Sequence, residues 1–315
     1  MAGKASTEAH SGYIDTAPTY HTDKQAHYVL PNGSPEHLRL ETQARHLQAI
    51  MNGRVIHAPL AKTEIRSILD VGCGTGVVTN YLAQQYPDAE VVGVDLSPVP
   101  ALRDRPSNVR FLQGNILTEK PSSWRPSEDS NGQANILSDA AAFDLIYSRL
   151  LLCGMSDWPQ YLRTCFQLLR PGGWTEIHDL DWIWYDRDGN DISATWDWLT
   201  RLRAAAEKRG LYFRCGSRTQ RWMEEAGFQD VQVRTYRWPF GGQWENEECW
   251  RDFGQYVASA MVEMFWHLIP RLMMGRPECT AEMVEGMQRD MQRDFAPVEG
   301  KHWVFYVSCG RKPEV

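Results

Sequence analysis

Short apolar runs alternate with amphipathic stretches along the first 180 residues of the chain. Five of these runs predict buried strands, at residues 66–72, 89–97, 108–116, 143–152 and 174–181. Helical spacing of apolar positions predicts helices at residues 35–51, 76–87 and 158–169. Strands that alternate with helices favour βαβ units, so the predicted fold class is α/β with a mostly parallel sheet.

The second half of the chain has a different pattern. Helices are expected at 193–209 and 217–226, and two or three more within 244–295, while late strands are expected at 227–241 and 302–312. Two late strands separated by mostly helical residues predict a sheet edge that carries a helical insertion. Such an insertion can form a lid over the carboxyl ends of the parallel strands, where open α/β sheets bind ligands.

These elements predict four segments. Residues 1–30 are expected to form a flexible tail, 31–180 a ligand-binding core with an N-terminal helix, 181–300 a helical lid with one late strand, and 301–315 a closing strand and the C-terminus. Within the core, the Ser-, Pro- and Asn-rich residues 118–142 predict a surface loop.

A glycine turn, GCGTG, follows the first predicted strand and opens a helix. Gly72, Gly74 and Gly76 allow a ligand to approach bare backbone, and the helix N-terminus offers free N–H groups. No Gly-Lys-Ser/Thr follows, which excludes a P-loop, and Val77 stands where the dinucleotide fingerprint needs glycine. Asp70, just before the turn, either caps it or contacts the ligand directly.

Polar residues also end the next two predicted strands. Asp95 lies about twenty residues beyond the turn, where a carboxylate can accept both hydroxyls of a ribose. Asn115 ends the third strand, where it could meet an adenine amino group. Leu96 and Ile116, which adjoin these two residues, are expected to contact the same ligand.

Taken together, these motifs resemble those of the class I S-adenosylmethionine-dependent methyltransferases. The matching stretches are DVGCGTG, Asp95, Asn115, FDLIYSR and RPGGW, and they cover residues 65–180. The resemblance implies a Rossmann-like, seven-stranded α/β sheet with an antiparallel last strand and helical lid insertions. It also implies S-adenosyl-L-methionine as cofactor and S-adenosyl-L-homocysteine as product.

A narrower resemblance is to the LaeA-like methyltransferases of fungal secondary metabolism. It rests on YVLPNGSPEHLRLETQ, on SPVPALRDRPSNVRF and on the stretch from IYSRLLL to EIHDLD. The resemblance implies that Tyr28 and Arg149 close over the cofactor. Arg149 also suits the methionine carboxylate, and its neighbour Ser148 is a further expected contact. Members of this group methylate specialised metabolites or act as regulators with velvet-type protein partners. Cys73 and the following VVTNY depart from the group's commoner form.

The catalytic residues are less clear from the sequence. Methyl transfer from a sulfonium can proceed by positioning alone, and a base is needed only for a hydroxyl, thiol or acidic carbon. His178, in EIHDLD, is the candidate base, and the alternative is a hydrogen-bonded wall residue. Asp179 and Asp181 lack the further ligand that a metal site requires, so no metal is expected.

Tryptophan and methionine gather in the second half. Nine of the 13 tryptophans fall between residues 182 and 266, and Met283, Met287 and Met291 share one helical face. These side chains form either a packing face or an adaptable apolar pocket for a bulky substrate or partner.

Composition narrows the class of partner. A net charge of −7 without a basic cluster argues against nucleic-acid binding, and no long apolar run predicts a membrane span. Seven scattered cysteines without a CxxC motif and the absence of a signal sequence indicate a cytoplasmic protein, or a nuclear one if it is regulatory.

The sequence therefore predicts an S-adenosylmethionine-dependent methyltransferase. The expected acceptor is a small secondary metabolite, aromatic or derived from a polyketide or peptide. Two alternatives stay open: a cofactor-binding regulator that works through protein partners, and a cofactor-assisted cyclase that transfers no methyl group.

Overall fold

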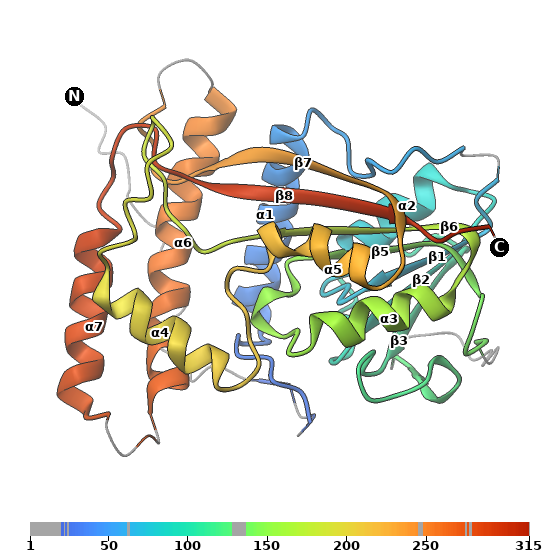
Figure 1. Ribbon diagram of the computed structural model, residues 1–315, viewed down its shortest axis with the longest axis horizontal. Coiled ribbons are helices and arrows are strands. Elements are labelled where there is room, and N and C mark those ends of the chain that lie inside the picture. Colours follow the sequence, from blue (N-terminus) through green and yellow to red (C-terminus); the bar gives the residue numbers. More distant parts are fainter. Residues whose placement is uncertain are drawn as a thin grey trace, which may run out of the picture.

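One mixed sheet forms the centre of the molecule. The computed structural model describes residues 20–21, 23, 25–61, 64–127, 137–244, 248–274, 276 and 279–314. Eight strands pair in the order β4-β3-β2-β1-β5-β6-β8-β7 (Figure 1). Their bounds are β1 Ser67–Val71, β2 Glu90–Asp95, β3 Val109–Gln113, β4 Arg125–Pro126, β5 Phe143–Arg149, β6 Leu169–Leu180, β7 Gln229–Pro239 and β8 His302–Arg311.

The strand directions confirm the predicted fold class. Strands β1, β2, β3, β5 and β6 pair in parallel, and β8 is antiparallel to both β6 and β7. The two-residue strand β4 adds a short antiparallel edge beside β3. Without β4, the sheet has the seven strands of a Rossmann-like class I methyltransferase.

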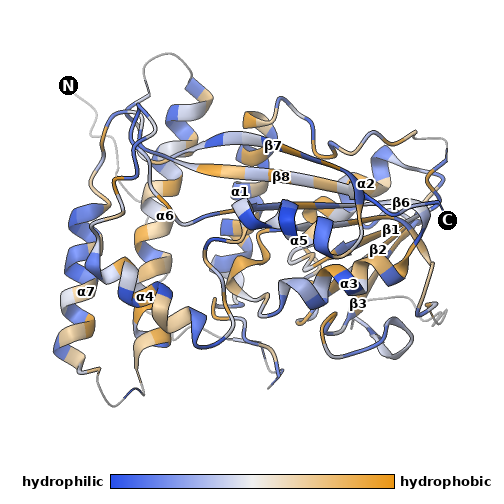
Figure 2. Ribbon diagram, in the orientation of Figure 1, coloured by the Kyte–Doolittle hydropathy of each residue, from blue (hydrophilic) through white to orange (hydrophobic). Residues whose placement is uncertain are grey.

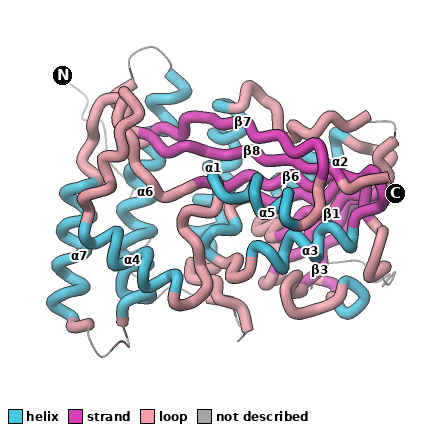
Figure 3. The backbone as a smooth tube through the Cα atoms, in the orientation of Figure 1, coloured by secondary structure: helices cyan, strands magenta, loops and turns pink. Residues whose placement is uncertain are grey.

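Helices cover the sheet and extend beyond it (Figures 1 and 3). The helices are α1 Ser34–Ile50, α2 Val77–Gln85, α3 Trp158–Leu168, α4 Asp197–Glu207, α5 Thr219–Glu225, α6 Glu248–Met273 and α7 Ala281–Asp294. Three 3-10 turns accompany them: η1 Pro121–Ser123, η2 Leu151–Cys153 and η3 Gly216–Arg218. Figure 1 shows α4, α6 and α7 grouped at one end of the sheet.

Both faces of the central strands are buried. All five residues of β1 are buried, which explains why this strand reads as a continuous apolar run. Leu82 of α2 packs with Ile68 and Leu145 on one face. Leu162 of α3 belongs with Leu69 and Ile146 to the larger core on the other face.

Helices α6 and α7 form the insertion between β7 and β8 that the sequence predicts. Met287 and Met291 of α7 are buried, while the opposite side of this helix is hydrophilic (Figure 2). Trp184 packs against Trp198 and Trp303 beneath these helices. Most of the predicted aromatic and methionine cluster therefore forms a packing core.

Some element boundaries differ from those expected. The strand expected to reach residue 152 ends at Arg149, because Leu150 has a φ of 57°, in the left-handed region. RPGG, expected as a turn before the fifth strand, lies within β6, where Gly172 has a φ of 78° and the pairing with β5 shifts register. The predicted helix at 193–209 is shortened to α4.

The cysteines and the helices bear on the sequence-based expectations of unpaired thiols and no membrane span. All seven cysteines are unpaired in the structure. Among the described residues, no helix combines the length and the apolar character that crossing a membrane requires. Most of the predicted tail, residues 1–19, lies outside the described residues, as do residues 128–136 of the predicted surface loop.

Candidate functional site

A pocket of about 460 Å³ opens at the carboxyl ends of the parallel strands. Its walls come from the turn after β1, from the ends of β2, β3 and β5, from α1 and from the segment 25–32 that precedes α1. The pocket therefore lies where open α/β sheets bind their ligands.

The glycine turn forms one wall with its backbone. Gly72, Gly74 and Gly76 all have positive φ angles, of 67°, 57° and 73°. The backbone nitrogens of Gly72 and Cys73 donate to the carbonyl of Val94 at 2.8 and 3.1 Å, which ties the turn to β2. Because α2 starts directly after the turn, its first N–H groups point toward the same end of the sheet.

The three glycines have different neighbours. Gly72 and Gly74 line the pocket, whereas Gly76 does not. A Cβ on Gly76 would lie 2.5 Å from the ring of Phe111, and one on Gly72 would lie 2.4 Å from Leu151. Only Gly74 has near-ordinary space for a Cβ, 3.4 Å from Leu40. Gly76 thus permits close packing of the turn against β3, and Gly74 leaves room at the pocket wall.

Asp70 lines the pocket beneath the turn and is nearly fully buried. Its Oδ2 accepts a hydrogen bond of 2.6 Å from the hydroxyl of Thr79 in α2. Burial raises the pKa of the Asp70 carboxyl to about 7. This bond ties β1 to α2 rather than capping the turn, and the place of Asp70 in the pocket wall leaves ligand contact open.

Asp95 ends β2 and lines the pocket. Its two carboxylate oxygens accept from the backbone nitrogens of Gly74 at 2.9 Å and Ser97 at 3.0 Å. Burial raises the pKa of Asp95, and these hydrogen bonds oppose the rise. Each oxygen keeps a further lone pair, so the carboxylate can still accept from two hydroxyls.

Asn115 also lines the pocket, but its amide is already engaged. Its side-chain oxygen accepts from the nitrogen of Leu117 at 3.0 Å, and its Nδ2 donates to Asp23 at 3.0 Å. Asn115 therefore shapes the turn after β3. Leu96 and Ile116 line the pocket beside it.

Tyr28 and Arg149 lie at the same pocket, far apart in sequence. Tyr28 packs so tightly over Gly154 that a Cβ there would lie 2.6 Å from its ring. Arg149 ends β5 and forms no ion pair with any residue that the structure describes. Ser148, between two lining residues on β5, does not line the pocket. Alternation along a strand points its side chain to the opposite face of the sheet.

An apolar wall continues the pocket beyond Arg149. It consists of side chains from β6, β7, α6, β8 and the loop after β6, namely Leu180, Trp182, Trp238, Met261, Met264 and Trp303. Except for Leu180, these residues come from the tryptophan- and methionine-rich second half of the chain, and only the folded structure brings them into one cavity with the glycine turn. Their convergence gives one cavity a polar end and an aromatic end.

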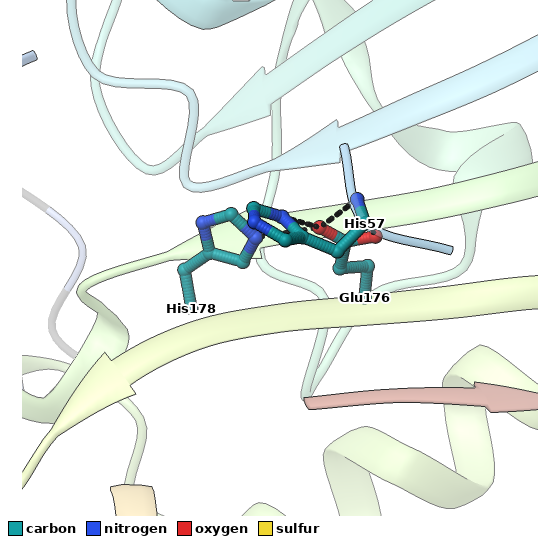
Figure 4. A group of neighbouring side chains, drawn as sticks. All are labelled: His57, Glu176 and His178. Atoms are coloured by element: carbon teal, nitrogen blue, oxygen red, sulfur yellow. Dashed lines mark hydrogen bonds and ion pairs between the residues drawn. The ribbon is translucent and has the colours of Figure 1, made fainter. Parts of the chain in front are cut away.

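The structure places the candidate base, His178, outside the pocket lining. Its imidazole is fully buried, with Nε2 2.6 Å from Oε1 of Glu176 and Nδ1 3.3 Å from the hydroxyl of Tyr147. Burial lowers the pKa of His178. Tyr147, in contrast, does line the pocket. Figure 4 shows the imidazole of His57 beside that of His178, with ring centroids 5.5 Å apart, and close to the Glu176 carboxylate.

Sequence reasoning missed Tyr147, Glu176 and His57. Tyr147 lies two residues before Arg149 on β5, and Glu176 lies two residues before His178 on β6. Residues spaced by two on a strand point to the same face of the sheet, and this spacing is the sequence signal that could have found Tyr147 and Glu176. The pairing between the strands, in which Tyr147 lies beside Glu176, appears only in the folded sheet.

A second missed feature is an ion pair in the pocket wall. Arg39 donates to Glu36 at 2.7 and 2.5 Å from the first turns of α1, and both residues are well buried. Helical spacing of three residues is a sequence signal for this pair, but its burial is not.

Comparisons with known proteins agree with this geometry. The model of a methyltransferase domain matches residues 39–233. The chain is 28% identical over 283 residues to methyltransferase pytC of Aspergillus terreus, covering 87% of this chain and 81% of that protein. It is 33% identical over 159 residues to methyltransferase str2 of Strobilurus tenacellus, covering 50% and 51% of the two chains.

Regulators are also among the relatives. The secondary metabolism regulator LAE1 of Hypocrea atroviridis is 30% identical over 263 residues, which is 80% of this chain and 70% of that protein. Among solved structures, the YcgJ protein of Bacillus subtilis aligns with a TM-score of 0.45 and 17% identity, over 86% of this chain and 100% of that one.

The strand order and the glycine turn define a class I methyltransferase core. The chain belongs to the methyltransferase-domain family, in its LaeA-like group. Proteins of this family use S-adenosyl-L-methionine, and the methyl transfer leaves S-adenosyl-L-homocysteine.

Proposed function

We propose that this protein transfers a methyl group from S-adenosyl-L-methionine to a small, aromatic or polyketide- or peptide-derived secondary metabolite. The observation that carries the proposal is the single cavity that joins the backbone cradle at Gly74 to the apolar wall at Trp182 and Trp303. Such a cavity accommodates a polar nucleoside and an apolar acceptor in contact with one another.

The polar end fits the cofactor. Asp95 has lone pairs for the ribose hydroxyls, Leu96 and Ile116 provide apolar walls for the adenine, and Arg149 offers a cation for the methionine carboxylate. Asn115 and Asp70 support the turns around these groups. When bound, the cofactor supplies an electrophilic methyl group on a sulfonium. The task of this chain is to hold both partners in line and to exclude water.

The apolar end favours a flat, bulky acceptor. Tryptophan side chains offer faces for aromatic stacking, and Met261 and Met264 of α6 have flexible, polarizable side chains that adapt to the shape of a ligand. The relatives named as methyltransferases pytC and str2 support an acceptor from secondary metabolism for this chain as well.

A second function, regulation through protein partners, is favoured by one observation: several relatives are named secondary metabolism regulators. A velvet-type partner is therefore the alternative ligand of this chain, and nuclear localisation would accompany it. A cofactor-assisted cyclase, which transfers no methyl group, is the remaining alternative.

One experiment separates these functions. The purified protein is incubated with S-adenosylmethionine and a metabolite extract of the source organism from which its gene is deleted. Release of S-adenosylhomocysteine together with one product heavier by a methyl group supports the transferase. A product of unchanged mass supports the cyclase. Cofactor binding with no change in any metabolite, together with capture of a velvet-type partner, supports the regulator.

A further inference from the structure

A continuous series of hydrogen bonds leads from the pocket into the sheet. The Tyr147 hydroxyl lies 3.3 Å from Nδ1 of His178, and Nε2 of His178 lies 2.6 Å from Oε1 of Glu176. These three side chains come from neighbouring strands, β5 and β6, and all are fully buried. Only Tyr147 lines the cavity.

The direction of each hydrogen bond follows from the charge on Glu176. Hydrogen bonds from His178 and His57 lower the pKa of Glu176 to about 2 despite its burial, so the carboxylate is ionised near neutral pH and only accepts. Nε2 of neutral His178 must therefore carry the proton. Nδ1 is left as an acceptor, and the Tyr147 hydroxyl donates to it.

This assignment leaves two lone pairs on the Tyr147 oxygen, and one of them accepts from the side chain of Arg149. A phenol that donates its proton inward can still accept a hydrogen bond from a hydroxyl in the pocket. Tyr147 also faces Arg149 and Asp70, which belong to the polar end of the cavity. Tyr147 thus contacts both the cavity and the buried imidazole.

Glu176 is held in place independently of His178. Its oxygens accept from the backbone nitrogen of His57 at 2.9 and 2.8 Å and from that of Ala58 at 2.6 Å. These bonds to the loop before β1 explain the presence of the carboxylate. They do not explain a buried imidazole directed at a pocket tyrosine, where an apolar residue would bury without any polar cost.

We propose that Tyr147 takes up the proton of an acceptor hydroxyl and passes its own proton to His178, with His178 and Glu176 as positioning residues. The proposal rests on the proposed methyl transfer and deepens it, because it assigns the acceptor to the phenols, enols and other O–H nucleophiles. It moves the base function predicted for His178 to a residue that borders the cavity.

The step is balanced in protons and electrons. The acceptor oxygen forms its bond to the methyl carbon, and sulfur keeps the electron pair of the carbon–sulfur bond that breaks. The acceptor proton moves to the Tyr147 oxygen as the tyrosine proton moves to Nδ1 of His178. The resulting imidazolium still donates its Nε2 proton in a hydrogen bond to the ionised Glu176, and this carboxylate stabilises the new positive charge. Loss of the proton to solvent after product release restores the neutral histidine.

Titratable groups from several elements surround this arrangement. They are His57 from the loop before β1, Asp70 of β1, Tyr86 beyond α2, Arg149 of β5, Tyr236 of β7 and Cys309 of β8. Burial, and to a smaller extent His57 and Arg149, lowers the pKa of His178 by opposing its positive charge, whereas Glu176 favours that charge. The proton therefore stays on Tyr147 in the resting state and moves only when an acceptor delivers another.

A buried metal is the competing interpretation of these side chains. His57, Glu176 and His178 each offer a ligand atom within 4.8 Å of the others. However, both oxygens of Glu176 already accept backbone N–H groups, and Nε2 of His178 carries the proton that bonds to Oε1. The geometry favours hydrogen bonding, and the metal content of the purified protein provides a direct check.

The first test is spectroscopic and needs no turnover. The full chain, labelled with ¹⁵N-histidine and bound to S-adenosylhomocysteine, is examined by NMR between pH 6 and 8. His178 is assigned by the loss of its signals in His178→Gln. We expect a neutral imidazole with its proton on Nε2, and a shift of Nδ1 in Tyr147→Phe toward the value of an unbonded nitrogen. A proton on Nδ1, an unchanged Nδ1 in the variant, or stoichiometric zinc would overturn the proposal.

The second test uses phenols of different acidity with matched anilines as probes. Tyr147→Phe should lower kcat by about 100-fold or more with 4-methoxyphenol, which must lose a proton, and far less with 4-nitrophenol, which is largely ionised in the assay. The wild type should also lose activity as the pH falls through the pKa of His178, and the variant should lack this limb. Tyr161→Phe, a fully buried tyrosine outside the pocket lining, is the matched control.

The outcomes separate the two proposals. Failure of S-adenosylmethionine to bind in a calorimeter overturns the proposed function itself. Binding with equal turnover in wild type and Tyr147→Phe overturns only the role of Tyr147. Turnover of the anilines alone, or of neither probe class while the cofactor binds, overturns the assignment to O–H acceptors.

Discussion

The carboxylate of Asp95 accepts a hydrogen bond of 2.9 Å from the backbone nitrogen of Gly74. This contact joins two features that are 21 residues apart, the end of β2 and the turn after β1. It fixes the carboxylate at the edge of the cavity with its remaining lone pairs toward the pocket. Asp95, the residue proposed to bind the ribose, and the glycine turn thus form one hydrogen-bonded unit.

We expect Asp95→Ala to weaken S-adenosylmethionine binding about 30-fold or more, because two charge-assisted hydrogen bonds to the ribose are lost. Isothermal titration calorimetry measures this change. Asp104→Ala, at an exposed aspartate outside the pocket lining, is the control and should bind as the wild type does. Equal affinity of the Asp95 variant and the control would refute the ribose assignment.

Arg149→Gln tests the other end of the cofactor. If the guanidinium holds the methionine carboxylate, the variant should bind S-adenosylmethionine about 10-fold or more weakly, since a charge-assisted pair is removed. Binding of 5′-methylthioadenosine, which lacks the amino-acid part, should stay within about twofold in the same titration. A parallel loss for both ligands would mean that Arg149 stabilises the pocket without contacting the carboxylate.

Alanine substitutions at Gly76 and Gly53 distinguish the cost of backbone strain from the cost of a steric clash. Both have positive φ, of 73° and 78°, but a Cβ meets the Phe111 ring at 2.5 Å only at Gly76. Gly53→Ala should therefore cost about 1 kcal/mol of unfolding free energy, and Gly76→Ala about 3 kcal/mol or more. Urea unfolding followed by tryptophan fluorescence measures both. Equal costs would show that β3 moves away to accommodate the new methyl group.

Asp179 makes the stability of the protein depend on pH. Burial raises the pKa of this carboxyl from 3.8 to about 7, so the folded state binds a proton that the unfolded state has released. The free energy of unfolding should accordingly fall as the pH rises from about 4 to about 7. Asp179→Asn, which carries no charge, should flatten this decline.

Asp179→Asn should raise the free energy of unfolding more at pH 8 than at pH 4. The two increases should differ by on the order of 2 kcal/mol. Urea unfolding at both pH values gives the difference. Asp144→Asn is the control, because the Asp144 carboxylate is paired with Arg170 at 2.8 Å and partly exposed. A gain that is the same at pH 4 and pH 8 would show that Asp179 is ionised in the folded protein.

The fold followed from the sequence because its signals are local. The strand-turn-helix of DVGCGTG, the acid that ends β2 and the alternation of strands with helices each depend on residues close in the chain. Boundaries were less predictable. Leu150 ends β5 by adopting a left-handed conformation that its residue type does not announce.

The candidate site also combines features that local sequence predicts with features that depend on contacts distant in the chain. The sequence by itself determined the glycine turn and Asp95, because both lie at strand ends that a parallel sheet always brings to one edge. Only the tertiary structure decided that Ser148 points away, that Trp182 and Trp303 complete the cavity, and that Tyr147 reaches His178. Those contacts depend on strand register and on packing between segments far apart in the chain, which local periodicity does not encode.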